Sequence, residues 1–185
     1  MLGAIMIRRA FLLLLFLAAP ALADDALGAA ANAAFLKANA SRPGTVTRPS
    51  GLQYRVLRPG FGRRPGANDV VRVAFKARLI DGRQVDATPP SLPAAMAMGT
   101  VSLSGLSEAL SLMHEGDRWE IVIPASLGFG VKEGASGAIP PNQTLIFDLT
   151  LVSAAPPQPG EALPENPLTY WSNGREVGGS FTIHP

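Results

Sequence analysis

Strict alternation of apolar and polar residues marks the middle of the chain. Apolar residues occupy every second position from Val71 to Leu79, and Arg72, Lys76 and Arg78 stand between them. A period of two with charges on one side predicts an antiparallel strand that packs on one face only. Shorter runs with the same period predict further strands at 52–57, 119–123 and 145–151.

One segment has the period of a helix instead. Apolar residues recur at spacings of three and four across residues 105–114, which predicts one short amphipathic helix that ends at Gly116. Asp81-Gly82 predicts a tight hairpin turn after the long strand. Several antiparallel strands with a single helix predict an α+β fold, a curved antiparallel β-sheet wrapped around one short α-helix. The core is expected between the helix and the sheet.

The N-terminus has the composition of a targeting segment. Arg8-Arg9 precede an apolar run at 11–17, and Ala21-Leu22-Ala23 supplies small residues at the two positions of a cleavage site. This pattern predicts a secretory signal peptide over residues 1–23, with cleavage after Ala23 and export to the periplasm. An uncleaved anchor is the alternative, and either Met1 or Met6 could be the start. After processing, no stable membrane span is expected.

The remaining chain divides by composition into four parts. An Ala-rich stretch predicts a short, exposed helix and a linker over 24–50, and the globular domain is expected at 51–153. A Pro-rich linker follows at 154–167. Asn173-Gly174 allows a hairpin in the C-terminal tail, 168–185.

Charge and cysteine content exclude several classes of function. The chain has 16 Lys and Arg against 14 Asp and Glu, and removal of Arg8 and Arg9 leaves 14 against 14, so no basic excess attracts nucleic acid. Without cysteine there is no disulfide or thiolate metal site, which suits the periplasm. His114 and His184 are isolated, so no metal or other cofactor is expected. The arginines at 55, 58, 63 and 64 favour a solvated face over a membrane patch.

Two segments together carry a family resemblance. Gly137-Ala138-Ile139-Pro140-Pro141 leads through a polar turn into the last strand, and Leu79-Ile80-Asp81-Gly82-Arg83-Gln84-Val85-Asp86 lies upstream. In this order they resemble the FKBP-type peptidyl-prolyl isomerases over about residues 44–153. The resemblance implies rotation about X–Pro bonds, with proline-containing peptides and unfolded exported proteins as partners. It also admits macrolide ligands.

The resemblance also implies the site residues. Asp86, Phe75, Phe129 and Phe147 match catalytic positions of the family. The substrate-binding positions fall on Val85, Met96, Leu103, Leu106 and Ile139. Phe75 and Phe129 stand where the family usually has tyrosine, Val85 replaces a phenylalanine, and Leu106 replaces the tryptophan of the pocket floor. Lost hydroxyl groups and lost pocket surface predict measurable but feeble isomerase activity.

The chemistry needs no nucleophile. Rotation about an X–Pro bond must break amide resonance, at a cost of about 18–20 kcal/mol, and an apolar cleft favours the twisted amide over the planar one. Periodicity alone would assign the same aromatic residues to an ordinary core. The alternative function is therefore a non-catalytic peptide-binding chaperone or an envelope scaffold.

Overall fold

The structure is a computed structural model of the 185-residue chain, and it describes residues 26–89, 91–134, 137–160 and 162–164. The expected signal peptide and the expected tail hairpin lie outside the described residues.

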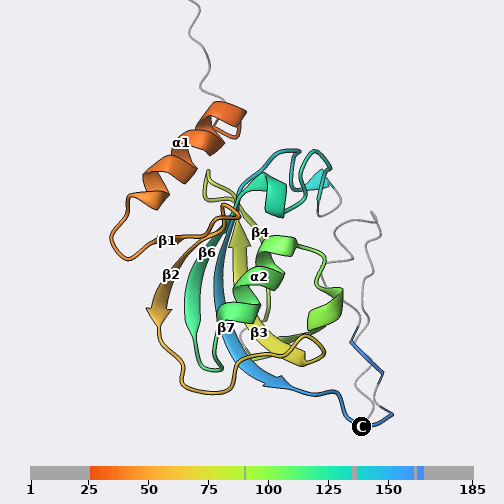
Figure 1. Ribbon diagram of the computed structural model, residues 1–185. Helices are drawn as coiled ribbons and strands as arrows, with labels where there is room; N and C mark the ends of the chain where they lie inside the picture. Colours follow the sequence, from red (N-terminus) through yellow and green to blue (C-terminus); the bar gives the residue numbers. More distant parts are fainter. Residues whose placement is uncertain (1–25, 90, 135–136, 161, 165–185) are drawn as a thin grey trace, which may run out of the picture.

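One antiparallel sheet forms the body of the molecule (Figure 1). Its order is β1-β2-β6-β7-β3-β4, and β5 pairs with β3. The strands are β1 (Val46–Thr47), β2 (Gln53–Arg58), β3 (Val70–Arg78), β4 (Gln84–Ala87), β5 (Ala94–Ala97), β6 (Arg118–Ile123) and β7 (Leu145–Ala155). The sequence prediction of an antiparallel sheet is confirmed, and the strands at 52–57, 119–123 and 145–151 are β2, β6 and β7.

The α-helix α2 (Ser104–Leu112) packs across one face of this sheet (Figure 1). It ends before Gly116, which has a positive φ of 89° and carries the turn into β6. Gly105 is required for the close approach of helix and strand, because a Cβ at this position would lie 2.6 Å from Cγ2 of Ile123. The short 3₁₀ helices η1 (Met98–Thr100) and η2 (Ala125–Leu127) flank the segment.

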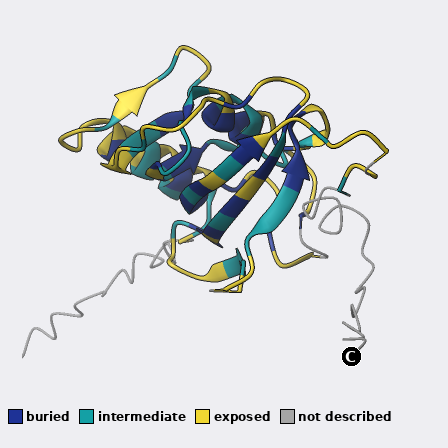
Figure 2. Cartoon of the chain, turned by 90° about the horizontal axis from the view of Figure 1, so that it is seen from below, coloured by how far each residue is buried: buried dark blue, intermediate teal, exposed yellow. Residues whose placement is uncertain are grey.

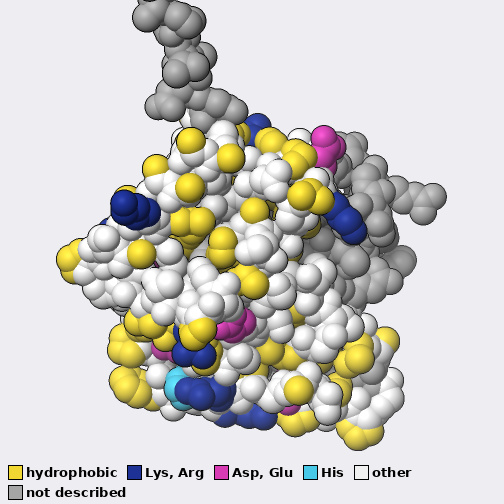
Figure 3. All heavy atoms as spheres, turned by 45° about the horizontal axis from the view of Figure 1, so that its top comes forward, with side chains coloured by type: hydrophobic (Ala, Val, Ile, Leu, Met, Phe, Trp, Pro, Cys, Tyr) yellow, Lys and Arg dark blue, Asp and Glu magenta, His cyan; other side chains and the backbone are white. Residues whose placement is uncertain are grey.

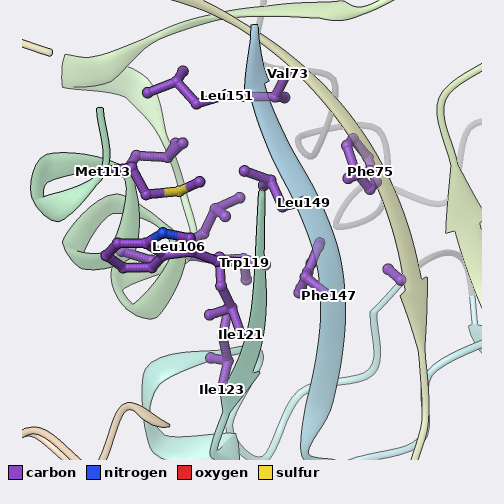
Figure 4. Packing of buried hydrophobic residues seen from close by; sticks show 14 of the residues in the cluster. Val73, Phe75, Leu106, Met113, Trp119, Ile121, Ile123, Phe147, Leu149 and Leu151 are labelled. Atoms are coloured by element: carbon purple, nitrogen blue, oxygen red, sulfur yellow. The ribbon is translucent and has the colours of Figure 1, made fainter. Parts of the chain in front are cut away.

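The core lies between α2 and the inner face of the sheet, as expected. Along β3, Val71, Val73, Phe75 and Ala77 are buried, while the intervening residues are half-buried or exposed (Figure 2). Trp119, Ile121 and Ile123 of β6 and alternate residues of β7 join them in one cluster (Figure 4). The Trp119 ring also stacks on Tyr54, with centroids 4.3 Å apart.

The N-terminal helix α1 (Ala29–Ala40) docks on the domain through amides rather than apolar side chains. Asn32 and Asn39, two turns apart on one side, are both buried. Oδ1 of Asn32 accepts from the backbone N–H of Thr144 at 2.8 Å, and Nδ2 of Asn39 donates to Oε1 of Gln53 at 2.7 Å. The expectation of an exposed helix was therefore incomplete, because a pattern search for apolar residues does not detect a polar docking face.

The outer face of the sheet is charged. Glu120 lies within 3.4 Å of the guanidinium groups of Arg42, Arg55 and Arg78, which come from three separate segments. Arg118 pairs with Asp148 at 2.6 Å. A cavity of about 260 Å³ on this side has Lys76, Arg118 and Asp148 among its lining residues.

Candidate functional site

Two phenylalanines on neighbouring strands form the centre of the site. Phe147 of β7 lies opposite Ala77 of β3, so Phe147 and Phe75 are diagonal neighbours on the inner face. Their ring centroids are 5.7 Å apart with an interplanar angle of 51°, a tilted contact typical of favourable aromatic pairs (Figure 4). Phe147 is fully buried and Phe75 nearly so.

The β3–β4 hairpin brings Asp86 beside this pair. Gly82 has φ 87° at the predicted turn, and Asp81 caps it by accepting from the N–H of Arg83 at 2.9 Å. Asp86 pairs with Ala77 but Gln84 pairs with Arg78, so Val85 is the extra residue of a bulge. A bulge redirects side chains, and here Val85 packs against the core while Asp86 is half-buried on the Ala77 side.

The environment of Asp86 disfavours its ionised form. Burial raises the pKa of Asp86, and the hydrogen bond that Oδ1 accepts from the N–H of Ala87 at 2.7 Å opposes the shift. Desolvation is the larger of the two causes. A half-buried carboxyl with a raised pKa beside aromatic rings is typical of a functional position.

Phe129 and Ile139 meet across a single glycine. Gly134 and Ile139 form an isolated antiparallel bridge, with both backbone hydrogen bonds at 3.0 Å. A Cβ at Gly134 would lie 2.7 Å from Cδ2 of Phe129, so the half-buried Phe129 ring lies directly against this backbone. Gly134 was missed in the sequence because a loop glycine without a neighbouring motif carries no distinguishing signal.

The first turn of α2 forms the far side of the candidate site. Leu103 is the N-cap residue of α2, and Leu106 follows Gly105 on the buried side of the helix. Oγ of Ser104 donates to the carbonyl of Leu127 at 3.2 Å, which ties this turn to η2. Met96 of β5 lies opposite Val71 of β3, lower on the same inner face.

The structure therefore gathers eight of the nine predicted residues in or against one hydrophobic cluster, and Asp86 lies beside it through its pairing with Ala77. Those with no more than 5% exposure form a closed floor: Phe75, Met96, Leu103, Leu106, Ile139 and Phe147. Val85, Asp86 and Phe129 are half-buried and form the accessible rim. Thr88 also belongs here, because its Oγ1 accepts from the N–H of Phe75 at 3.0 Å and its own N–H donates to the Phe75 carbonyl at 3.0 Å. No sequence signal had indicated Thr88.

Within the described part of the chain, no group of three or more His, Cys, Asp or Glu side chains could hold a metal ion. In the same residues, no helix has both the length and the apolar character that crossing a bilayer requires.

Comparisons with known proteins point to one family. Residues 62–152 match the family model described as "FKBP-type peptidyl-prolyl cis-trans isomerase", and residues 19–56 match "Domain amino terminal to FKBP-type peptidyl-prolyl isomerase". The "Outer membrane protein MIP" of Legionella longbeachae is 43% identical over 120 residues, which are 65% of this chain and 51% of that protein. The "Peptidyl-prolyl cis-trans isomerase Mip" of Coxiella burnetii is 43% identical over 65% of this chain and 52% of its own length. The chain thus spans about half the length of these relatives.

Solved structures give the same picture. The crystal structure of a peptidyl-prolyl cis-trans isomerase from Pseudomonas syringae matches with a TM-score of 0.63 and 31% identity, covering 68% of this chain and 92% of that one. That of FkpA from Escherichia coli matches with a TM-score of 0.62 and 32% identity, covering 69% of this chain and 59% of that one.

Proposed function

We propose that this chain, which belongs to the family of FKBP-type peptidyl-prolyl cis-trans isomerases, catalyses rotation about peptide bonds that precede proline. The observation that carries the proposal is the meeting of three chain segments at one end of the inner face. The β3–β4 hairpin brings Asp86, β7 brings Phe147, and the loop after η2 brings Phe129 and Ile139.

The mechanism depends on differential binding. A planar amide has charge separated between its oxygen and nitrogen, and the twisted amide of the transition state loses much of that separation. An apolar environment made of Phe129 at the rim and the buried Phe75 and Phe147 behind it solvates the twisted form better, relative to water, than the planar form. The proline ring packs on the half-buried side chains of the rim, and the substrate backbone lies along the same rim.

Asp86 is the polar group of this rim. Its Oδ1 already accepts from the Ala87 N–H, which fixes the direction of the carboxyl group. The other oxygen is then available to accept a substrate N–H or to interact with the distorted amide. We assign Asp86 the orienting role, and the three phenylalanines the stabilisation of the twisted amide.

Kinetics of prolyl isomerisation test the proposal directly. A protease-coupled assay or NMR exchange on a proline peptide should show a rate above background, and a rate equal to background would remove the assignment as an enzyme. Phe129→Tyr should raise kcat/KM by about two- to ten-fold, because a hydroxyl group on the rim adds one hydrogen bond of about 0.5–1.5 kcal/mol to the substrate. An unchanged rate in this variant would place Phe129 away from the substrate.

A second candidate is a non-catalytic peptide-binding chaperone or an envelope scaffold. The closed floor favours it: Leu106, Met96 and Ile139 have no exposed surface, so a bound proline meets less of the pocket than an open cleft would offer. Titration with a proline-containing peptide discriminates between the two functions, because saturable binding without rate enhancement supports the chaperone.

We further propose that the protein is exported and acts on unfolded exported proteins in the periplasm. Arg8-Arg9, the apolar run at 11–17 and Ala21-Leu22-Ala23 support export. N-terminal sequencing of the protein from a periplasmic extract should begin at Asp24, and a start at Met1 or Met6 would contradict cleavage. Macrolides are proposed as ligands of the same rim, and their competition with the peptide in the titration tests this.

A further inference from the structure

An aromatic side chain is exposed to solvent at the end of the molecule away from the candidate site. Phe61 lies in the loop between β2 and β3, and its exposed fraction is 91%. This loop crosses the lower end of the sheet, whereas η2 and the loop that follows it lie at the upper end (Figure 1). Exposure of a single apolar residue is ordinary, so the way in which the loop is held decides its meaning.

The loop is fixed on both sides of Phe61. The N–H of Gly60 donates to Oδ1 of Asp117 at 2.5 Å, and the N–H of Gly62 donates to the carbonyl of Glu115 at 3.1 Å. A Cβ at Gly60 would lie 2.3 Å from the Asp117 nitrogen, and one at Gly62 would lie 2.5 Å from Cβ of Glu115. Both glycines are therefore pressed against the turn between α2 and β6, and the Phe61 ring is directed outward from a solid support.

Three arginines lie within three residues of Phe61 in the chain, while two nearby acids are engaged inside. Arg58, Arg63 and Arg64 are exposed; the Arg63 guanidinium pairs with Asp69 at 2.8 Å and donates to the Ala154 carbonyl at 3.0 Å, so Arg58 and Arg64 are the cations offered to a partner. Asp69 and Asp117 are buried, and backbone N–H groups donate to both carboxylates. Figure 3 shows basic side chains gathered beside the histidine at the lower edge; Arg64 lies 3.5 Å from Nε2 of His114. The outward surface of this lobe, residues 58–64, is thus apolar at its tip and cationic around it.

We propose that the 58–64 lobe binds the surface of an anionic lipid bilayer, with the Phe61 ring at the level of the headgroups. A projecting ring on a solid support has no hollow for a peptide. It suits a fluid interface, where aromatic rings are favoured and arginines pair with anionic headgroups. A second copy of the chain fits less well, since a symmetric contact would place Arg58 and Arg64 against the same two arginines.

The placement leaves the candidate site free. Because the lobe and the Phe129–Ile139 segment lie at opposite ends of the sheet, a molecule bound through Phe61 presents the rim of the site away from the bilayer (Figure 1). The inference does not depend on isomerase activity, and its test measures none.

The test must be local, because the apolar run at 11–17 of the full chain can itself enter vesicles. Phe61→Trp in the full chain is mixed with vesicles of phosphatidylglycerol and phosphatidylcholine whose acyl chains carry bromine, a fluorescence quencher. Val131→Trp is the matched control, since Val131 is 78% exposed on the opposite end of the sheet. The fluorescence of the tryptophan introduced by Phe61→Trp should fall about two-fold on mixing with these vesicles, as expected for a ring at the headgroup boundary. The fluorescence of the tryptophan introduced by Val131→Trp should not fall.

Charge variants complete the test. Arg58→Gln with Arg64→Gln should raise the lipid concentration needed for half-maximal quenching of Phe61→Trp by about five-fold per charge removed. Arg83→Gln with Lys132→Gln should leave that concentration unchanged. Equal quenching at both tryptophan positions, or none at Phe61→Trp, overturns the proposal. So does equal quenching with phosphatidylcholine alone. A dimer in sedimentation that Phe61→Ser converts to a monomer would assign the lobe to a second copy instead.

Discussion

Asp86 shows at the scale of one residue how function and stability can oppose each other. Because burial raises its pKa, the folded state binds the Asp86 proton more tightly than the unfolded state does. Below the ordinary pKa of 3.8 the carboxyl is neutral in both states, so burial carries no ionisation cost. As pH rises through 3.8 to the raised value, ionised Asp86 increasingly destabilises the fold.

Asp86→Asn should therefore be as stable as the natural chain or more stable at pH 7, with the difference vanishing below pH 3.8. Its kcat/KM should fall about ten-fold, the loss expected for one hydrogen bond to a charged group. Thermal unfolding across pH and isomerase kinetics measure the two effects. Asp81→Asn in the same hairpin is the control, because Asp81 is exposed at the turn and should change neither. A variant that lost stability at pH 7 would give Asp86 a structural role.

Gly134 matters both as a residue and for the element it belongs to, because its lack of a side chain lets the Phe129 ring lie against the bridge between Gly134 and Ile139. Gly134→Ala places a methyl group 2.7 Å from the ring, and the ring must move. If Phe129 contacts the substrate as proposed, kcat/KM should fall about ten-fold, since small displacements of such a group are costly, with a smaller effect on stability. Gly99→Ala is the control, because the added methyl group would lie 3.8 Å from the Ala67 carbonyl oxygen, an ordinary van der Waals contact. Equal kinetics for both variants would contradict the placement of Phe129.

At the scale of elements, α1 is attached by hydrogen bonds of its asparagine side chains, which an alanine substitution removes. Asn32→Ala leaves the buried N–H of Thr144 without its acceptor, which should cost about 1–3 kcal/mol of unfolding free energy. Lys37→Ala on the exposed side of the same helix should cost less than about 0.5 kcal/mol. Urea unfolding of the two variants measures the difference. Similar values would mean that α1 detaches without weakening the domain.

The same contact connects α1 with the site. Asn32 holds Gln143 and Thr144, which follow Ile139 by only a few residues and lead into β7. A helix that the sequence predicts as exposed therefore supports the segment that carries one wall of the rim.

Strands and helices with a periodic pattern of apolar residues were predictable from the sequence, but the contacts between these elements were not. Period two located β3, and spacings of three and four located α2, because burial on one face leaves that trace in the sequence. The aromatic pair Phe75 and Phe147 was predictable only through the order of family motifs. The polar docking of Asn32, the support of Phe129 by Gly134 and the closed floor under Leu106 depend on which segments meet in space. Polar or glycine residues in loops carry no period that could reveal this.

Over the whole molecule, the balanced net charge conceals an uneven distribution of charged groups. With 14 charges of each sign after residue 23, the chain has no net excess, yet Glu120 pairs with three arginines on the outer face and three others lie within three residues of Phe61. Net charge therefore excludes a general attraction to polyanions but says nothing about a local patch.

The position of β7 has a consequence for how the chain reaches its final form. The last of the described strands lies between β6 and β3, and among the described strands it alone connects the half-sheet β1-β2-β6 with the half-sheet formed by β3, β4 and β5. Until residue 155 has been synthesised, no backbone hydrogen bonds between strands join the two halves, and the aromatic floor lacks Phe147. The sheet is therefore incomplete until this strand has emerged, and its central position is filled after both flanking strands have been made.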